Sequence, residues 1–219
     1  MPTSPHIPAA PSATIMQRLE RSPALVLAAA VVGISFAAPL VRLSNAPALA
    51  IATWRLGFSM VIIALILATT GGWRAWRTMP REHVVLSFGA GALLALHFWS
   101  WNVSLRYTTV AASVSLVSMQ PIIIAVISAR WLHERATAAQ WVAIVVAVVG
   151  AIVIGWADVP RGASAADQSR ALLGDALALL GALTGALYYL IGRRVRPTLP
   201  LWPYVGLVYG AAFLVCAGL

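Results

Sequence analysis

Apolar residues fill seven long stretches of the chain, and short polar segments that carry arginine separate them. The stretches cover residues 23–41, 47–69, 84–105, 108–129, 138–156, 171–192 and 201–219. A helix needs about 18 or more apolar residues to cross a bilayer, and several stretches lack the polar side that a soluble helix carries. The pattern predicts an all-α fold, a polytopic transmembrane helix bundle of about seven spans.

The segment before the first span, residues 1–23, is rich in Pro, Ser and Ala and carries Arg18 and Arg21 close to the span. This composition predicts a disordered tail, and arginines beside a span favour the cytoplasmic side. Small residues at 35–38 would also fit the cleavage site of a signal peptide. We favour an uncleaved first helix, because its apolar stretch is longer than a typical signal core and further spans follow.

The arginines predict which side of the membrane each loop faces. With the N-terminus inside, ten lie in inner segments: Arg18, Arg21, Arg74, Arg77, Arg81, Arg130, Arg135, Arg193, Arg194 and Arg196. Outer segments then hold four: Arg42, Arg106, Arg161 and Arg170. Because cytoplasmic loops carry an excess of basic residues, we expect a multi-pass protein with a cytoplasmic N-terminus. The expected location is the plasma membrane, which is the inner membrane of a bacterium.

Composition narrows the class of function. Hydrophobic residues make up 61% of the 219 residues and charged residues only 10%, so the lipid bilayer is the expected surrounding of the spans. The net charge of +9 comes from scattered arginines. Without a basic helix face that also carries aromatic residues, nucleic acid is not the expected partner. The single cysteine, Cys216, offers no disulfide framework or cysteine-rich metal site, and we expect no cofactor.

One arginine, Arg55, lies inside the second span. A cation at that depth costs roughly 2.5 to 3.5 kcal/mol on the mildest insertion scale, so such residues usually face a protein interior, a water-filled cavity or a ligand. No acidic residue lies deep in an apolar stretch, which favours an anionic substrate group bound by Arg55, with Ser59 on the same face. The alternative is structural, because the guanidinium can bind helix-end carbonyls or reach outward to the interface.

Polar side chains of the third and fourth spans are further candidates. His97 and Trp101 share one face of the third span. Trp101 is a candidate to shape a substrate cavity, and His97 is a candidate proton carrier because imidazole titrates near neutral pH. Gln120 precedes Pro121 in the fourth span, where proline frees a carbonyl that water or substrate can reach. Each has a structural alternative, since lone histidines and intramembrane polar groups often make hydrogen bonds within the protein.

Glycines mark the expected helix contacts. Gly181, Gly185 and Tyr188 lie within one arc of the sixth span, and the spacing of the two glycines suits close helix packing. One interpretation of this arc is helix packing alone. The other is that the arc lines a cavity in which Tyr188 contacts the substrate. Gly150 belongs to an alanine-rich face of the fifth span, and Gly33 is the packing glycine expected in the first.

A weak internal repeat relates the two ends of the chain. Residues 33–42 align with 184–193 without a gap. An offset of five spans inverts the second copy in the membrane, and inverted repeats with a site between them are a recurrent transporter plan. This predicts a first five-helix repeat at 24–156, an external linker at 157–170 and an incomplete second repeat at 171–219.

The order of several motifs is similar to that of the EamA-type drug/metabolite transporters (the DMT superfamily). They are Pro47 with Arg55, Ser104-Leu105-Arg106-Tyr107-Thr108, Gln120-Pro121, Leu132-His133-Glu134-Arg135, and Gly150. The resemblance implies ten helices in two inverted five-helix repeats that carry small metabolites across the plasma membrane. It places Arg55, Pro121 and Glu134 at positions that the family pattern favours. Glu134 falls at a cytoplasmic turn, where we expect helix capping.

The leading hypothesis is a secondary transporter of small metabolites, such as amino-acid-like or other carboxylate-bearing solutes, that works by alternating access. The alternative is a truncated, non-transporting membrane protein or a fragment that forms a homo-oligomer, because the second repeat ends inside its second helix. We do not expect an intramembrane enzyme, since the chain has no Gly-x-Ser-x-Gly elbow, no His-Glu-x-x-His motif and no paired intramembrane aspartates.

Overall fold

The computed structural model describes residues 23–131, 137–157 and 164–219, which form helices and no strand. The predicted tail, apart from Pro23, and the predicted capping residue Glu134 lie outside the described residues. The chain divides into two compact units, residues 1–37 and 38–219, and each is described by itself. The predicted all-α fold is confirmed.

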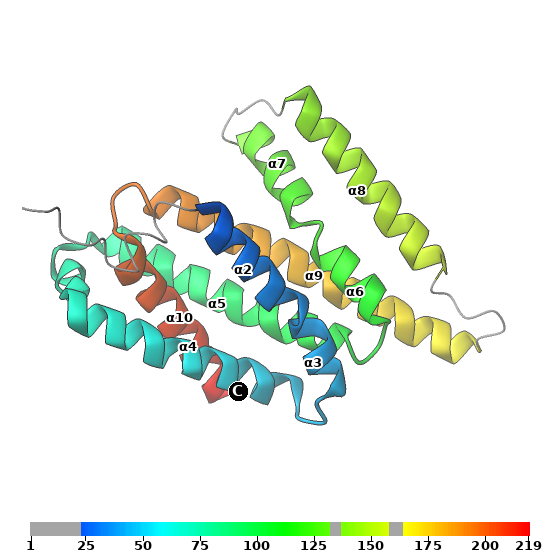
Figure 1. The fold of residues 1–219 in the computed structure, drawn as a ribbon, viewed down its shortest axis with the longest axis horizontal. Coiled ribbons are helices and arrows are strands. Elements are labelled where there is room, and N and C mark those ends of the chain that lie inside the picture. Colours follow the sequence, from blue (N-terminus) through cyan, green and yellow to red (C-terminus); the bar gives the residue numbers. More distant parts are fainter. Residues whose placement is uncertain (1–22, 132–136, 158–163) are drawn as a thin grey trace, which may run out of the picture. The chain divides into compact units, whose positions relative to one another are not determined.

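The helices are labelled in Figure 1. They are α2 (Pro23–Ser35), α3 (Ala37–Leu43), α4 (Ala48–Thr70), the short 3₁₀ helix η1 (Gly72–Thr78), α5 (Arg81–Ser104), α6 (Val110–Val117), α7 (Gln120–Trp131), α8 (Ala138–Ala157), α9 (Ala165–Val195) and α10 (Leu201–Gly218).

Six segments of the described chain are long and apolar enough to cross a membrane. They are Ala24–Leu43, Ala48–Thr70, Arg81–Ser104, Val110–Arg130, Ala165–Val195 and Leu201–Gly218. The remaining predicted span corresponds to α8, whose apolar stretch Ala138–Val153 is shorter. The protein is therefore a multi-pass membrane protein.

Two spans that the sequence analysis treats as single helices are each built from two helices. α2 ends at Ser35 and α6 ends at Val117, and each of these residues lies four positions before a proline, Pro39 or Pro121. A proline has no backbone N–H to donate to the carbonyl four residues back, so the helix is interrupted there. The turn between α6 and α7 tightens instead, with the N–H of Met119 donating to the carbonyl of Leu116 at 3.1 Å.

The start of α9 differs from the prediction. The external linker was expected to continue to residue 170, but the helix already begins at Ala165. Ser164 explains the earlier start, because its hydroxyl oxygen accepts a hydrogen bond from the N–H of Asp167 at 3.2 Å and its O–H donates to the Asp167 carboxylate at 2.7 Å. This pair caps the first turn, and the carboxylate lies at the positive end of the helix dipole.

The start of α8 is capped in the reciprocal way that its sequence indicates. The N–H of Thr137 donates to Gln140 Oε1 at 2.7 Å, and the N–H of Gln140 donates to Thr137 Oγ1 at 3.3 Å. Two backbone donors that have no partner inside the helix are thereby satisfied.

The helix α5 is central to the core of the second unit, because it packs against α4, α9 and α10. Buried side chains of the core are Ala52, Leu56, Ala90, Leu94, Ala95, Phe98, Val195, Leu199, Tyr204, Val208, Ala212 and Cys216. Glycine permits the close approach of α5 to α10, since a Cβ atom at Gly91 would lie 2.5 Å from the Cβ of Ala211.

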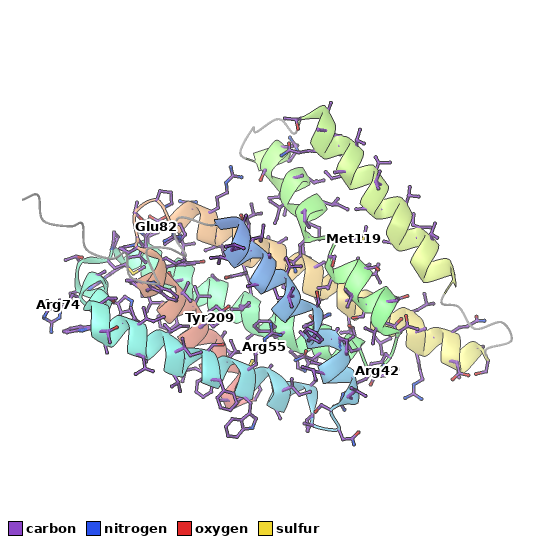
Figure 2. All side chains as sticks on the ribbon, viewed as in Figure 1. Arg42, Arg55, Arg74, Glu82, Met119 and Tyr209 are labelled. Carbon is purple, nitrogen blue, oxygen red and sulfur yellow. The ribbon has the colours of Figure 1, made fainter. Side chains whose placement is uncertain are left out.

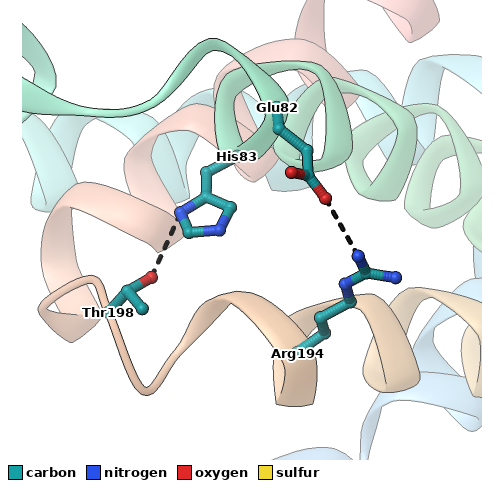
Figure 3. A network of polar contacts seen from close by, with 4 residues as sticks. All are labelled: Glu82, His83, Arg194 and Thr198. Atoms are coloured by element: carbon teal, nitrogen blue, oxygen red, sulfur yellow. Dashed lines mark hydrogen bonds and ion pairs between the residues drawn. The ribbon is translucent and has the colours of Figure 1, made fainter.

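Polar contacts at one end of the bundle show that α5 and α9 run antiparallel (Figure 3). Glu82 at the start of α5 pairs with Arg194 near the end of α9 at 2.9 Å. Beside this ion pair, Thr198 Oγ1 lies 3.1 Å from His83 Nδ1. At the other end, the backbone of Gly174 on α9 approaches Thr108, which follows α5.

Candidate functional site

Arg55 lies on α4 within the span, with its side chain half-buried. The guanidinium carbon is 4.6 Å from the ring centroid of Phe98 on α5, which is a cation–π contact. Tyr209 is partly buried on α10, which packs against α4, and Figure 2 shows the side chains of Arg55 and Tyr209 at the middle of the bundle. Among the described residues, no carboxylate pairs with the guanidinium and no carbonyl accepts a hydrogen bond from it.

Ser59 follows Arg55 by one helical turn and is half-buried. Its hydroxyl donates to the carbonyl of Arg55 at 2.9 Å, so its proton is used within its own helix. Only the oxygen lone pairs of Ser59 remain for a ligand. The predicted role of Ser59 in substrate binding therefore reduces to accepting a hydrogen bond.

His97 connects α5 to α9. Its Nδ1 lies 2.7 Å from the carbonyl oxygen of Gly181. A carbonyl only accepts, so Nδ1 carries the proton and Nε2 is the nitrogen that can take up a second one. This hydrogen bond within the protein is what a purely structural histidine would make. It also fixes the ring, so that Nε2 points in a defined direction.

Trp101 is stacked on His97, with ring centroids 6.5 Å apart and an angle of 15° between the planes. Trp101 is only 8% exposed, and its indole N–H finds no acceptor among the described residues. A buried donor without an acceptor destabilises the protein unless a ligand or water supplies one. The indole N–H of Trp101 is therefore a donor that a ligand or water can satisfy, and the role of Trp101 in substrate binding stays a prediction.

Gln120 reaches the same region from the first turn of α7. A Cβ atom built on Gly185 of α9 would lie 2.7 Å from Gln120 Nε2 and 2.9 Å from His97 Nδ1. The absence of a side chain at Gly185 thus lets the amide of Gln120 and the ring of His97 lie side by side. The structure brings together three residues from three predicted spans.

The other packing glycines differ in their surroundings. Gly181 faces α5, where a Cβ atom would lie 3.3 Å from Ser100 Oγ. Gly150 on α8 has no atom of the described residues within 4 Å of such a Cβ, so its predicted packing contact is not seen there. Gly33 belongs to the separate first unit, and its packing role stays a prediction.

Tyr188 lies one turn beyond Gly185 on α9 and is half-buried against the core. Tyr209 of α10 packs against the same core. His97 also lies within the field of the Arg55 charge. Phe98 contacts both Arg55 and the ring of His97, and it belongs to the core that Tyr188 packs against, so these residues of α4, α5 and α9 form one connected group.

Phe98 was not predicted from the sequence as a contact of Arg55, and Tyr209 was not connected with it. Counting depth from the loop shared by α4 and α5 would have found Phe98. Arg55 lies 15 residues before Thr70, where α4 ends, and Phe98 lies 17 residues after Arg81, where α5 begins. Since both helices rise equally per residue, the two side chains reach similar depths.

Comparison with protein families identifies the class of the chain. The sequence pattern of the EamA-like transporter family matches residues 23–156, which is more than half of the 219 residues. The chain belongs to the EamA-like transporter family. The matched part of this EamA-like transporter contains Arg55, His97, Trp101 and Gln120. Comparison with curated proteins and with solved structures finds no match.

Membership in the EamA-like family agrees with the membrane-spanning helices of the chain. The family is one of membrane transporters of small molecules and not one of enzymes. The general class of function is therefore transport of small molecules across a membrane.

Proposed function

We propose that this EamA-like chain is a secondary transporter of small, carboxylate-bearing metabolites and that Arg55 binds their anionic group. One observation carries the proposal. Arg55 is half-buried within a membrane span and has no carboxylate partner among the described residues. An anion brought by the substrate would compensate its charge.

The chemistry of arginine fits this role. A guanidinium presents five N–H donors in a fixed plane and can bind a carboxylate through two parallel hydrogen bonds. The ring of Phe98 attracts the cation but is a poor hydrogen-bond acceptor, so the N–H donors of Arg55 remain available. Tyr209 adds a phenolic group from α10, which packs against α4.

Three neighbours extend the proposed site beyond the anionic group. The amide of Gln120 and the indole N–H of Trp101 offer hydrogen bonds to polar atoms of a substrate, while Tyr188 limits the volume. His97 is fixed by Gly181 and is proposed to carry a proton on Nε2. Coupling to a proton is how a secondary transporter of this kind would drive uphill movement.

We propose further that the chain lies in the plasma membrane with its N-terminus in the cytoplasm, in line with the bias of its arginines. Alternating access would move the predicted first repeat against the residues of the second around the group centred on Arg55.

The experiment is transport by the purified chain in proteoliposomes, with a panel of radiolabelled amino acids and other carboxylates. For substrates that the chain carries, Arg55→Gln is expected to weaken apparent affinity by about tenfold or more, because a charge-assisted hydrogen-bonded pair is lost. Arg55→Lys keeps the charge without the planar fork and is expected to retain part of the affinity.

The matched control is Arg77→Gln, which removes an exposed arginine of η1 that lies over the ring of Trp73. Wild-type affinity in Arg55→Gln would refute the binding role of Arg55. Absence of transport for every solute of the panel would instead favour the alternative of a non-transporting membrane protein.

A further inference from the structure

A cavity of about 320 Å³ lies away from Arg55, at the end of the bundle where α3 leads into α4 and α5 leads into α6. It is lined by Val41, Arg42, Ser44, Asn45, Leu105 and Arg106. Figure 2 shows Arg42 at the opposite end of the bundle from Arg74 and Glu82. The cavity therefore lies at the ends of membrane spans, where lipid headgroups and water meet the protein.

Both arginines of the cavity are held in place by backbone carbonyls. Arg42 donates to the carbonyls of Leu105 and Thr108, the second at 3.2 Å. Arg106, which follows α5, donates in turn to the carbonyl of Ala46 in the segment between α3 and α4. Each arginine uses one terminal nitrogen for these bonds, so its other N–H donors remain available.

The positive charges of the cavity have no negative partner in the described part of the chain. Carbonyls orient a guanidinium but do not neutralise it, and among the described residues the ion pair is Glu82 with Arg194, at the opposite end. A further cation, Arg170 of α9, lies 5.9 Å from the ring centroid of Tyr107, the residue that follows Arg106. An anion between Arg42 and Arg106 would relieve their repulsion.

We propose that Arg42 and Arg106 form a binding site for an oxyanion, a phosphate or carboxylate group, in this cavity. The size of the cavity suits such a group with a small part of its parent molecule. The side chains of Ser44 and Asn45 add neutral hydrogen-bonding groups beside the two cations. The anion comes either from the headgroup of an anionic lipid or from a solute in the water.

Two binding experiments on the detergent-purified chain separate these sources. Native mass spectrometry measures retention of phosphatidylglycerol against phosphatidylcholine, and calorimetric titration measures binding of inorganic phosphate. We expect selective retention of the anionic lipid if the headgroup is the ligand, and phosphate binding if a free anion is the ligand. Either result supports the site only if the variants below remove it.

The decisive variants are Ser44→Asp and Ser44→Asn. The serine hydroxyl accepts a hydrogen bond from the N–H of Ala46 at 3.2 Å, and both replacements offer an oxygen that can do the same. Ser44→Asp places a permanent carboxylate in the cavity and is expected to weaken anion binding by about tenfold, whereas the neutral Ser44→Asn keeps it within about twofold of wild type.

A second pair of variants removes the cations. Arg42→Gln with Arg106→Gln is expected to weaken binding at least as much as Ser44→Asp. Arg74→Gln with Arg77→Gln removes two exposed arginines of η1 and is expected to leave binding unchanged. Should the first double variant not fold, the Ser44 pair still decides. Equal anion binding in wild type, Ser44→Asp and Ser44→Asn would overturn the proposal, as would the absence of selective lipid or phosphate binding in wild type.

Discussion

The contact of Arg55 with Phe98 offsets only part of the cost of a charge inside the membrane. A cation–π contact contributes about 0.5 to 2 kcal/mol, whereas insertion of arginine at depth costs roughly 2.5 to 3.5 kcal/mol on the mildest scale. The distance of 4.6 Å shows that the ring is in contact, yet it cannot replace an anion. The remaining imbalance is the physical reason to expect a negatively charged ligand at this residue.

A proton on His97 can be tested by changing that residue alone. His97→Gln removes the titrating ring but leaves an amide that can donate to the carbonyl of Gly181. We expect the wild-type transport rate to change with pH between roughly 5 and 8, and the variant rate to stay constant over this range. The measurement is initial uptake into proteoliposomes at a series of pH values.

The control for this prediction is His83→Gln, which alters a histidine that contacts Thr198 at the end of the bundle (Figure 3). It is expected to retain the wild-type pH profile. If the profile of His97→Gln matches that of the wild type, His97 carries no proton during transport and its bond to Gly181 is purely structural.

At the scale of elements, the pairing of α5 with α9 positions most of the candidate site. Gly181 and Gly185 of α9 allow α5 to approach closely, and Gly174 does the same for Tyr107 and Thr108, which follow α5. Because the two helices are antiparallel, His97 meets the middle of α9, and the break between α6 and α7 brings Gln120 to the same level. The break follows from Pro121, so one proline determines where the side-chain amide of Gln120 lies.

This packing predicts different outcomes for three glycine substitutions. Gly185→Ala puts a methyl 2.7 Å from Gln120 Nε2 and 2.9 Å from His97 Nδ1, and we expect a destabilisation of about 1 to 3 kcal/mol from overpacking. Gly181→Ala meets its nearest atom, Ser100 Oγ, at 3.3 Å and is expected to have a smaller effect. Thermal unfolding in detergent, followed by tryptophan fluorescence, measures both.

Gly150→Ala is the matched control, since a Cβ atom at Gly150 meets no described atom within 4 Å. Alanine there is expected to be neutral or to stabilise by up to about 1 kcal/mol, because it restricts the unfolded chain. The double variant Gln120→Ala with Gly185→Ala should recover part of the lost stability. Equal unfolding temperatures for Gly185→Ala and Gly150→Ala would show that α7 and α9 do not meet as described.

At the scale of the whole molecule, the ion pair between Glu82 and Arg194 connects the predicted first repeat to the second. Their side chains are 63% and 71% exposed, so the pair adds little to stability, about 0 to 1 kcal/mol. The buried contacts of α5 with α4, α9 and α10 hold this end together instead.

The membrane orientation is a prediction at this scale. On a background with Cys216→Ala, the variant Asn45→Cys should react from outside the cell with a membrane-impermeant maleimide, and Thr78→Cys should react only after permeabilisation. The expectation follows from the ten arginines of the predicted inner segments against four outside. The reverse pattern of labelling would place the N-terminus outside.

The sequence by itself determined the helical class, the approximate positions of the spans and the family. Apolar stretches of membrane-spanning length indicate helices, because a helix satisfies its backbone hydrogen bonds within its own segment in lipid. Arg55 was also recognisable from the sequence as an unusual charge, since the free-energy cost of placing an arginine in the membrane depends on its depth and hardly on its neighbours. Helix interruptions at Ser35 and Val117 were readable in principle from the prolines four residues on.

Only the tertiary structure decided which helices are neighbours and what each candidate side chain contacts. The periodicity of a span shows which residues share a face, but it contains no information on the partner helix or on the register between them. The contact of Arg55 with Phe98, the bond of His97 to Gly181 and the cavity between Arg42 and Arg106 all depend on that register. Their physical origin is the close packing of α5 against its neighbours, which brings together residues that lie far apart along the chain.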